Sequence, residues 1–296
     1  METHPEALGL VCIAGGGASH TFFSMKDGYA LYRCDECRML SVYPLPTSTD
    51  DVYKEDYFFG AHDGFGYVNY DNDKEAMRSS FEYALDTVEK LQAKEKKGSL
   101  LDVGAATGFF LTIAKKRGWD VHGIEIGDIA AQAARTKDLK VDTGTLSSVS
   151  LLESAYDVVT LFDVIEHMPD PIGDLRKVYR ALSPGGLILI NTPDVGSLYA
   201  KMLGKRWHLI VPPEHLYYFN KKPMEAVLTR TGFEVVSFSR LPKQFRSSYA
   251  LSTAGHWLSL PFLNAAANFV RQHSWIDINL PLDFRDNLFV IARKQS

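Results

Sequence analysis

The chain has 296 residues, of which 46% are hydrophobic and 23% charged, and these fractions are ordinary for a globular protein. Its formal net charge is −4 and it has no long basic run, which argues against a nucleic-acid backbone as the bound surface. No stretch has the pattern of a signal peptide or the apolar length of a bilayer-spanning helix. We therefore expect a cytoplasmic protein that acts on a small molecule and binds no nucleic acid.

The chain before residue 98 divides into two parts. Residues 1–47 contain short β-prone runs and turns, which predict a small ribbon-like module. In residues 48–97, aromatic side chains first crowd among Asp and Gly, which predicts a lid or pocket wall. From about 75 to 94 apolar residues then recur at helical spacing, so an amphipathic helix should pack against the main domain.

Strand and helix patterns alternate from residue 99 onward. Strands are predicted at 99–103, 120–126, 156–162, 187–190, 233–239 and 287–293. Helices are predicted at 109–117, after an Asp128 cap, at 172–182, and around Pro223 up to Gly232. This alternation predicts an α/β fold with a doubly wound, mostly parallel sheet.

The core of this fold should comprise residues 98–240, completed by a last strand in residues 285–296. Between them, residues 241–284 contain an apolar helical stretch. We expect that stretch to form a helical insertion that covers the substrate mouth, since it lacks the Lys/Arg-rich face of a membrane-surface helix.

A glycine loop at residues 100–108 is the strongest functional signal. An apolar strand runs into Asp102, and Gly104 and Gly108 then allow a tight turn and close approach to a ligand. The loop does not match the dinucleotide fingerprint, because that pattern requires glycine at 106 and glycine or alanine at 109. A carboxylate here would also repel a pyrophosphate but attract an ammonium group. S-adenosylmethionine carries such a group, and its ribose would suit a second acid, Glu125.

Four segments follow one another in the order Asp102–Gly108, Val121–Glu125, Tyr156–Asp163 and Leu182–Gly186. Together they resemble the class I S-adenosylmethionine-dependent methyltransferases, especially the ubiquinone-biosynthesis-like and sugar C-methyltransferase-like branches. The resemblance covers about residues 98–240 and the last strand. It implies a Rossmann-like fold with a seven-stranded sheet, S-adenosylmethionine as cofactor, and methyl transfer to oxygen or carbon of a small molecule.

The resemblance also implies a cofactor shell. Its residues are Asp102, Gly104, Thr107, Gly108, Glu125, Ile126, Thr145, Leu146, Phe162 and Asp163. The family usually offers an acid to the adenine amino group, but Gly144, Thr145 and Leu146 occupy that place here. Thr145 is one candidate for this contact, and Asp142, displaced by register, is another.

Two histidines are candidates for the catalytic base. His167 ends an Asp163-x-x-Glu166-His167 run at the start of a helix. In the ubiquinone-like branch a similar run, with glutamate at the first position, is implied to hold a divalent cation. Three interpretations of His167 remain open: a base or ligand that faces the substrate, a hydrogen bonder at the helix start, and a metal ligand.

The second candidate is His215, in a proline-braced loop where it follows Glu214. This pair resembles the Glu-His pair that sugar C-methyltransferases place against the substrate, which implies His215 as proton acceptor and Glu214 as its support. The alternative is structural: His215 bonds backbone carbonyls and residues 217–219 fill the core.

The cysteines suggest a metal site. Cys34 and Cys37 resemble one half of the zinc module found ahead of the methyltransferase domain in the sugar-modifying branch. Cys12 supplies a third thiol, but Gly15 stands where a fourth is expected, so His20 is the candidate fourth ligand. A degenerate module that folds without zinc is the alternative.

Two other functions compete with methyl transfer. A catalytically silent relative would bind the cofactor, or only a partner protein, through the same fold. A nicotinamide-dependent oxidoreductase would bind NAD(H) and tolerate Asp102→Asn, and the mismatched glycine loop argues against it.

Overall fold

The protein is described here from a computed structural model. The structure describes residues 9–15, 17–46, 75, 77–92, 96–242, 244–257, 260–273, 275–280 and 283–295. The aromatic segment predicted to form a lid, and the ends of the N-terminal module, lie outside these residues.

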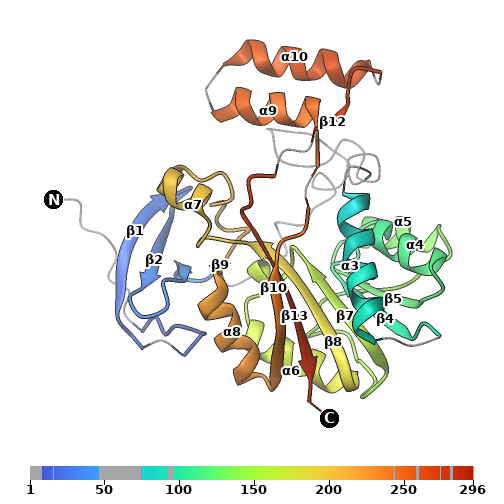
Figure 1. Cartoon of the computed structure of the whole chain (residues 1–296). Helices are drawn as coiled ribbons and strands as arrows, with labels where there is room; N and C mark the ends of the chain where they lie inside the picture. Colours follow the sequence, from blue (N-terminus) through green and yellow to red (C-terminus); the bar gives the residue numbers. More distant parts are fainter. Residues whose placement is uncertain are drawn as a thin grey trace.

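A seven-stranded sheet forms the centre of the fold (Figure 1). Its strands are β4 (Ser99–Val103), β5 (Asp120–Glu125), β6 (Lys140–Thr143), β7 (Tyr156–Phe162), β8 (Leu182–Pro193), β10 (Phe233–Ser239) and β13 (Asn287–Lys294). The strand order is β10-β13-β8-β7-β4-β5-β6, and only β13 pairs antiparallel with its neighbours. The predicted doubly wound, mostly parallel sheet is therefore confirmed. The predicted strand limits agree closely except at β8, which was predicted at 187–190, and β6 was not among the predicted strands.

Helices cover both faces of this sheet. The flanking helices are α3 (Arg78–Gln92), α4 (Phe109–Lys116), α5 (Asp128–Arg135), α6 (Pro171–Ala181) and α8 (Lys221–Arg230). Successive strand residues point to opposite faces, so Leu100 joins the core cluster with α3, α4 and α5, while Leu101 joins the cluster with α6 and α8. Asp128 was expected to cap α5, but it is the first helical residue and Gly127 is the N-cap, with no side-chain hydrogen bond.

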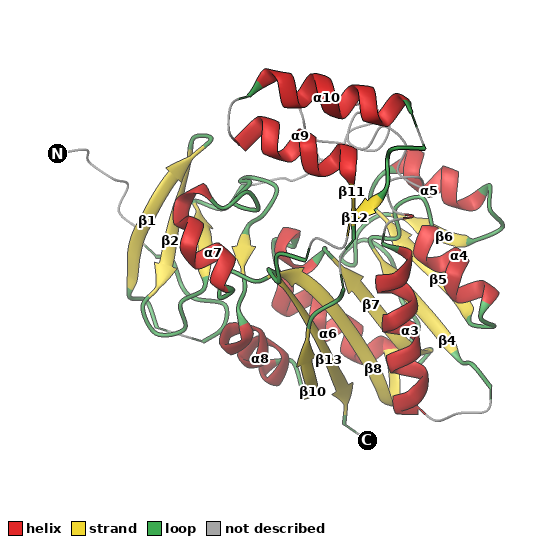
Figure 2. Ribbon diagram, turned by 45° about the horizontal axis from the view of Figure 1, so that its top comes forward, coloured by secondary structure: helices red, strands yellow, loops and turns green. Residues whose placement is uncertain are grey.

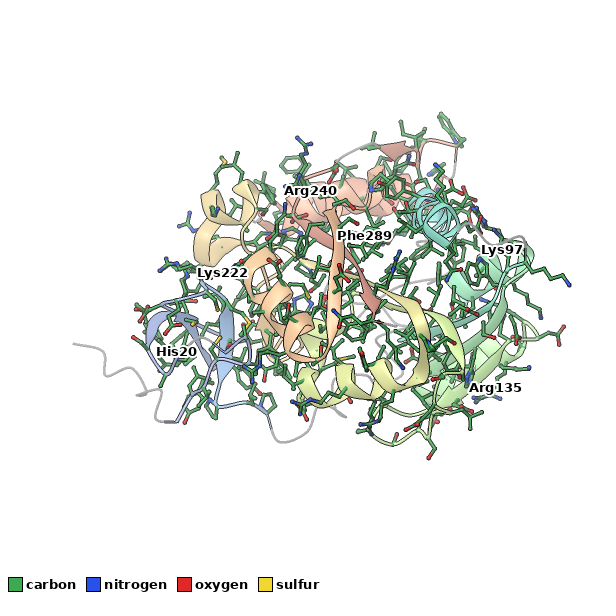
Figure 3. All side chains as sticks on the ribbon, turned by 60° about the horizontal axis from the view of Figure 1, so that its bottom comes forward. His20, Lys97, Arg135, Lys222, Arg240 and Phe289 are labelled. Atoms are coloured by element: carbon green, nitrogen blue, oxygen red, sulfur yellow. The ribbon has the colours of Figure 1, made fainter. Side chains whose placement is uncertain are left out.

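A smaller antiparallel sheet lies to one side of the main sheet (Figure 2). It contains β1 (His20–Lys26), β2 (Tyr29–Cys34), β3 (Leu40–Tyr43) and β9 (Tyr217–Tyr218). The last of these strands comes from the segment after β8, so the N-terminal module shares a sheet with a distant part of the chain. Lys222 on α8 reinforces this contact by donating to the Glu36 carbonyl at 2.9 Å (Figure 3).

Short elements connect the two sheets. They are the 3-10 helices η1 (Ile165–His167) and η2 (Gly204–Arg206) and the helix α7 (Leu198–Leu203). Trp207 follows η2, is fully buried against the N-terminal sheet, and donates from Nε1 to Asp286 at 3.1 Å. This buried ring anchors the segment that carries the predicted Glu214–His215 pair.

The insertion before the last strand is a helical hairpin. It contains β11 (Phe245–Arg246), α9 (Ser247–Trp257), α10 (Pro261–Gln272) and β12 (Asn279–Leu280). The hairpin stands beyond the edge at which the parallel strands end (Figure 1). Asp277 closes its base, because its carboxylate accepts from the backbone and the hydroxyl of Ser248, both at 3.0 Å. None of the described helices is long and apolar enough to cross a membrane.

Candidate functional site

The loop between β4 and α4 requires glycine for two reasons. Gly104 and Gly108 both have a φ of +77°, a backbone conformation that residues with a Cβ rarely adopt. A Cβ on Gly104 would lie 2.5 Å from Val164 Cγ2, and one on Gly108 would lie 2.3 Å from Leu139 Cδ1. The loop therefore holds its backbone close to the neighbouring strands and opens α4 at the carboxyl edge of the sheet.

A cavity lies against this loop. It comprises about 370 Å³ of space between atoms, a figure that includes open solvent. Its walls are formed by Phe81, Asp102, Gly104, Ala105, Phe109, Phe110, Phe162 and Asp163. Four residues predicted for the cofactor shell, Asp102, Gly104, Phe162 and Asp163, thus line one cavity.

Aromatic rings form one wall of the cavity, and of these only Phe162 was predicted as a site residue. Phe81 on α3 lies with its ring centroid 5.3 Å from Phe110 and 5.5 Å from Phe162. Phe110 meets Phe162 edge to face at 5.0 Å. The helical spacing of Phe81 indicated a packing role, and only the docking of α3 on α4 brings it to the cavity.

Asp102 is the acid of this cavity. Its side chain is buried, and Oδ1 accepts a 2.6 Å hydrogen bond from Thr160 Oγ1 on β7. Burial raises its pKa to about 7, the Thr160 hydrogen bond opposes this rise, and the nearby Glu125 charge adds to it. A buried carboxylate in this position would be stabilised by a cationic ligand group.

Glu125, the second predicted acid, lies under the glycine loop. Its Oε2 accepts from Ala106 N at 2.7 Å and its Oε1 from Gly127 N at 2.8 Å. Burial raises the pKa of Glu125, and the backbone hydrogen bonds oppose that rise. The carboxylate thus braces the loop, and its remaining acceptor capacity would serve the ribose hydroxyls.

The residues predicted to contact the adenine differ in burial and in their hydrogen-bond partners. Leu146 is buried, and Ile126 and Thr145 are half-buried near the ends of β5 and β6. Thr145 Oγ1 lies 2.6 Å from Ser147 Oγ. Asp142, the alternative acid, is exposed and pairs with His122 Nε2 at 2.9 Å. Thr107 is buried within the loop, and its carbonyl accepts from Lys137 Nζ at 2.8 Å.

Asp163 has strained backbone geometry at the end of β7. Its φ is +56°, which is costly for a residue other than glycine. Asn191 on β8 holds it there, because Asn191 Nδ2 donates to Asp163 Oδ1 at 2.7 Å and its carbonyl accepts from Asp163 N at 2.8 Å. Asn191 was not predicted, although its place at the carboxyl end of a central strand is a signal for function.

His167 and His215 meet beside this region. Their rings lie edge to face, with centroids 4.7 Å apart and an interplanar angle of 79°. His167 Nδ1 lies 2.7 Å from the Glu214 carbonyl oxygen, and His215 Nδ1 lies 2.8 Å from that of Leu209. A carbonyl only accepts, so each Nδ1 carries the hydrogen and each Nε2 keeps its lone pair.

Burial keeps both imidazoles neutral. It lowers the pKa of His167 to about 4, against the opposing effects of the Glu214 carbonyl and the Asp163 charge. It also lowers the pKa of His215 well below the usual value, and the proximity of His167 adds to this effect. His167 lies in the 3-10 helix η1, where the sequence predicted the start of a longer helix.

The hydrogen bonds differ from the predicted pairing, in which Glu214 supports His215, and match the structural alternative, in which His215 bonds a backbone carbonyl. The backbone carbonyl of Glu214 accepts from His167, and His215 is held by Leu209. The Glu214 carboxyl is half-buried, and burial raises its pKa. Glu214 thus positions the other histidine of the pair through its main chain.

The three cysteines come together in the core beneath the N-terminal sheet. All are buried, and the sulfurs of Cys12, Cys34 and Cys37 lie within 4.8 Å of one another. Cys12 and Cys37 are hydrogen-bonded at 3.5 Å, which lowers the pKa of Cys37 to about 6 and raises that of Cys12.

No fourth ligand joins these cysteines among the described residues. His20 stays outside the group, with Nδ1 3.0 Å from the Ala18 carbonyl oxygen, so the structure does not support it as the zinc ligand. At Gly15 a Cβ would lie 2.9 Å from Arg230 Nη1. The residues present therefore provide three of the four ligands of a structural zinc site.

The chain matches a known family over more than half its length. The family model, described as a methyltransferase domain, matches residues 75–238. A ubiquinone biosynthesis O-methyltransferase of Pseudomonas aeruginosa is 31% identical over 166 residues, which cover 50% of this chain and 71% of that protein. A protein of the same name from Saccharophagus degradans is 31% identical. That match covers 45% of this chain and 59% of the relative.

Solved structures agree on the fold. A SAM-dependent methyltransferase from Thermotoga maritima has a TM-score of 0.50 and 20% identity, and covers 76% of this chain and 94% of its own. A methyltransferase structure from Bacillus halodurans has a TM-score of 0.51 and 16% identity. The match covers 72% of this chain and 100% of that chain. With the glycine loop, the buried acid and the strand order, these matches show that the chain belongs to the class I S-adenosylmethionine-dependent methyltransferases.

Proposed function

We propose that this enzyme transfers a methyl group from S-adenosylmethionine to a hydroxyl group of a small-molecule acceptor. The matched relatives are named as O-methyltransferases, and this supports oxygen over carbon as the methyl acceptor. Methyl transfer from a sulfonium needs an aligned nucleophile and a place for the acceptor's proton.

The observation that carries this proposal is the pair of neutral histidines at the carboxyl edge of the sheet. Each Nδ1 is anchored on a carbonyl, which leaves two Nε2 lone pairs at fixed positions. The Asp163 charge acts on His167, and Asp163 also lines the cofactor cavity. His167 follows Asp163 closely in the chain, and this supports the proposal that the pair receives the proton of an acceptor bound beside the cofactor. In this proposal His215 is the base and His167 assists it.

The cofactor would lie with its methionine end along the glycine loop and its ammonium group toward Asp102. The ribose would lie toward Glu125, and the adenine toward Ile126, Thr145 and Leu146. The burial of both acids supports this arrangement, because each is better stabilised by a ligand than by solvent.

The test has two stages. Calorimetric titration with S-adenosylmethionine and with NADH should show binding of the first only. Methyl transfer should then be followed with labelled S-adenosylmethionine and a panel of small phenols and alcohols. In His215→Gln we expect a loss of kcat of about 100-fold or more, with cofactor affinity retained. Unchanged turnover in this variant and in His167→Gln would refute the base assignment while leaving the family intact.

For the N-terminal cysteines we propose a degenerate module that folds without zinc. The cysteines supply only three of the four ligands that a structural zinc requires, and this supports the proposal. The Arg230 guanidinium beside Gly15 supports it as well, because a cation there disfavours a fourth, metal-bound group. Metal analysis should find equal zinc in the wild type and in Cys34→Ser. A stoichiometric loss of zinc in Cys34→Ser would contradict the proposal.

A further inference from the structure

A second group of potential ligands surrounds the histidine pair. Glu166 and His167 come from η1, directly after β7, and His215 comes from the segment before β9. One ligand atom from each lies within 4.8 Å of the others. We propose that Glu166, His167 and His215 form a binding site for a divalent transition-metal or zinc ion.

The orientation of the two imidazoles supports this site. A histidine that binds a metal usually donates its other ring N–H to a carbonyl or carboxylate, which fixes both the tautomer and the ring. His167 and His215 each have this arrangement, with Glu214 and Leu209 as the carbonyl partners. Their Nε2 atoms therefore carry the lone pairs that a metal requires.

A hydrogen bond also fixes the carboxylate of Glu166. Glu166 is only 1% exposed, and its Oε2 accepts from Thr192 Oγ1 on β8 at 2.9 Å. One carboxylate and two neutral imidazoles give a ligand set with a single negative charge. A bound dication would offset the cost of burying that charge.

The donor atoms indicate the class of metal. Magnesium and calcium prefer oxygen ligands, whereas two imidazole nitrogens with one carboxylate suit zinc or ferrous iron. Asp163 accepts from Asn191 and is not in the group, while His215 is. Two nitrogen donors and one oxygen donor predict selectivity for zinc over magnesium.

The site would link two parts of the fold. Leu216 N donates to the Glu166 carbonyl at 2.8 Å, and the next residues form β9 beside β3. A metal held by η1 and His215 would add a cross-link between the main sheet and the N-terminal sheet. Metal binding should therefore raise the melting temperature as well as occupy the site.

Three protein ligands leave coordination positions for an exogenous oxygen. A bound metal would lower the pKa of a coordinated acceptor hydroxyl. The histidines would then act as ligands in place of the base role proposed for His215, and the acceptor's proton would leave to solvent. This inference rests on the proposed methyl transfer but replaces its histidine-base step. Metal binding is measured without acceptor or cofactor, so its failure would leave the histidine-base mechanism standing.

The test uses the full chain after removal of metals with a chelator. Calorimetric titration with zinc chloride should show one site of N/O type, and titration with magnesium chloride should show much weaker binding. His215→Gln and Glu166→Gln should each weaken zinc binding by about 100-fold or more and abolish the rise in melting temperature. Asp163→Asn is the matched control and should bind zinc as the wild type does.

Cobalt loading separates this site from the cysteines. Cobalt held by Glu166, His167 and His215 should show ligand-field absorption without the sulfur-to-metal charge-transfer band of a cysteine site. Circular dichroism checks that each variant is folded. Zinc binding that is lost in Asp163→Asn but kept in His215→Gln would overturn the proposal, as would zinc binding lost only in Cys34→Ser. Absence of zinc binding to the wild type would also overturn it.

Discussion

The hydroxyl of Thr160 on β7 donates a 2.6 Å hydrogen bond to Asp102 on the adjacent strand β4. The two residues are in register in the parallel pair. Thr160 is fully buried, so this hydrogen bond fixes the carboxylate at the wall of the cavity. The position of the acid thus depends on the pairing of two strands as well as on the glycine loop.

Replacement of Asp102 by Asn should weaken S-adenosylmethionine binding by about 10- to 100-fold, since a hydrogen bond to a charged group contributes about 1.5–3 kcal/mol. Calorimetric titration measures the change. Asp86→Asn on α3 is the control, because that side chain is 52% exposed and should leave the affinity unchanged. Equal affinities in all three proteins would show that Asp102 does not contact the ammonium group.

Cofactor affinity should also depend on pH. The pKa of Asp102 is raised to about 7 by burial, so the carboxylate is increasingly protonated below that pH. An ammonium ligand needs the ionised form, and we expect the Kd to rise by about tenfold per pH unit below 7. Above about pH 8 the cofactor's own amino group loses its charge, and affinity should fall again. Asp102→Asn should remove the acidic arm of this profile, and persistence of that arm would assign it to another group.

The contribution of Asp102 to folding stability has a pH dependence opposite to that of cofactor affinity. Its pKa is higher in the folded than in the unfolded chain, so the folded state binds more protons between about pH 4 and 7. Stability from this residue therefore increases as the pH falls through that window. Urea unfolding of the wild type minus that of Asp102→Asn, measured at pH 8 and at pH 5.5, isolates this contribution.

Gly104→Ala should disrupt the loop far more than Gly185→Ala. Both positions have a positive φ, +77° and +74°, so both variants carry backbone strain of about 1 kcal/mol or more. A Cβ at Gly104 meets Val164 at 2.5 Å, whereas a Cβ at Gly185 meets nothing within 4 Å. Urea denaturation and cofactor titration should show an additional loss only in Gly104→Ala. Similar losses in both would mean that strain alone is responsible.

Phe81→Ala should affect both stability and binding. Phe81 is 6% exposed and packs on Phe110 and Phe162, so its truncation should cost about 3–5 kcal/mol in free energy of unfolding. The variant should also bind the cofactor less tightly, because one wall of the cavity is lost. Tyr83→Ala on the same helix is the control, since Tyr83 is 42% exposed and should cost little. A cofactor affinity equal to wild type in Phe81→Ala would exclude that ring from the site.

Local patterns were sufficient for the secondary structure of the core. The alternation of apolar strands and helical periods predicted β10 at its observed limits and most other strands within one or two residues. Hydrophobic periodicity reports burial directly, and the core of an α/β sheet is buried on both faces. The exceptions were β6, for which no limits were predicted, and β8, which extends back to Leu182 through a Ser-Pro-Gly-Gly stretch that is typical of a turn.

Pairings between distant segments were not predictable in the same way. The addition of β9 to the N-terminal sheet depends on where the chain after β8 returns, and two residues carry too little pattern to reveal it. The Glu214–His215 pair shows the same limit. Sequence neighbours were expected to be partners, but the Glu214 carbonyl holds His167 and Leu209 holds His215.

The sequence by itself determined the class of fold and the tight loop between β4 and α4, because Gly104 and Gly108 act through local backbone geometry. Only the tertiary structure decided which side chains share a site. Glu166, His167 and His215, or Phe81 and Phe162, meet because strand ends and packed helices bring them together. Such contacts depend on three-dimensional packing, and spacing along the chain carries little information about it.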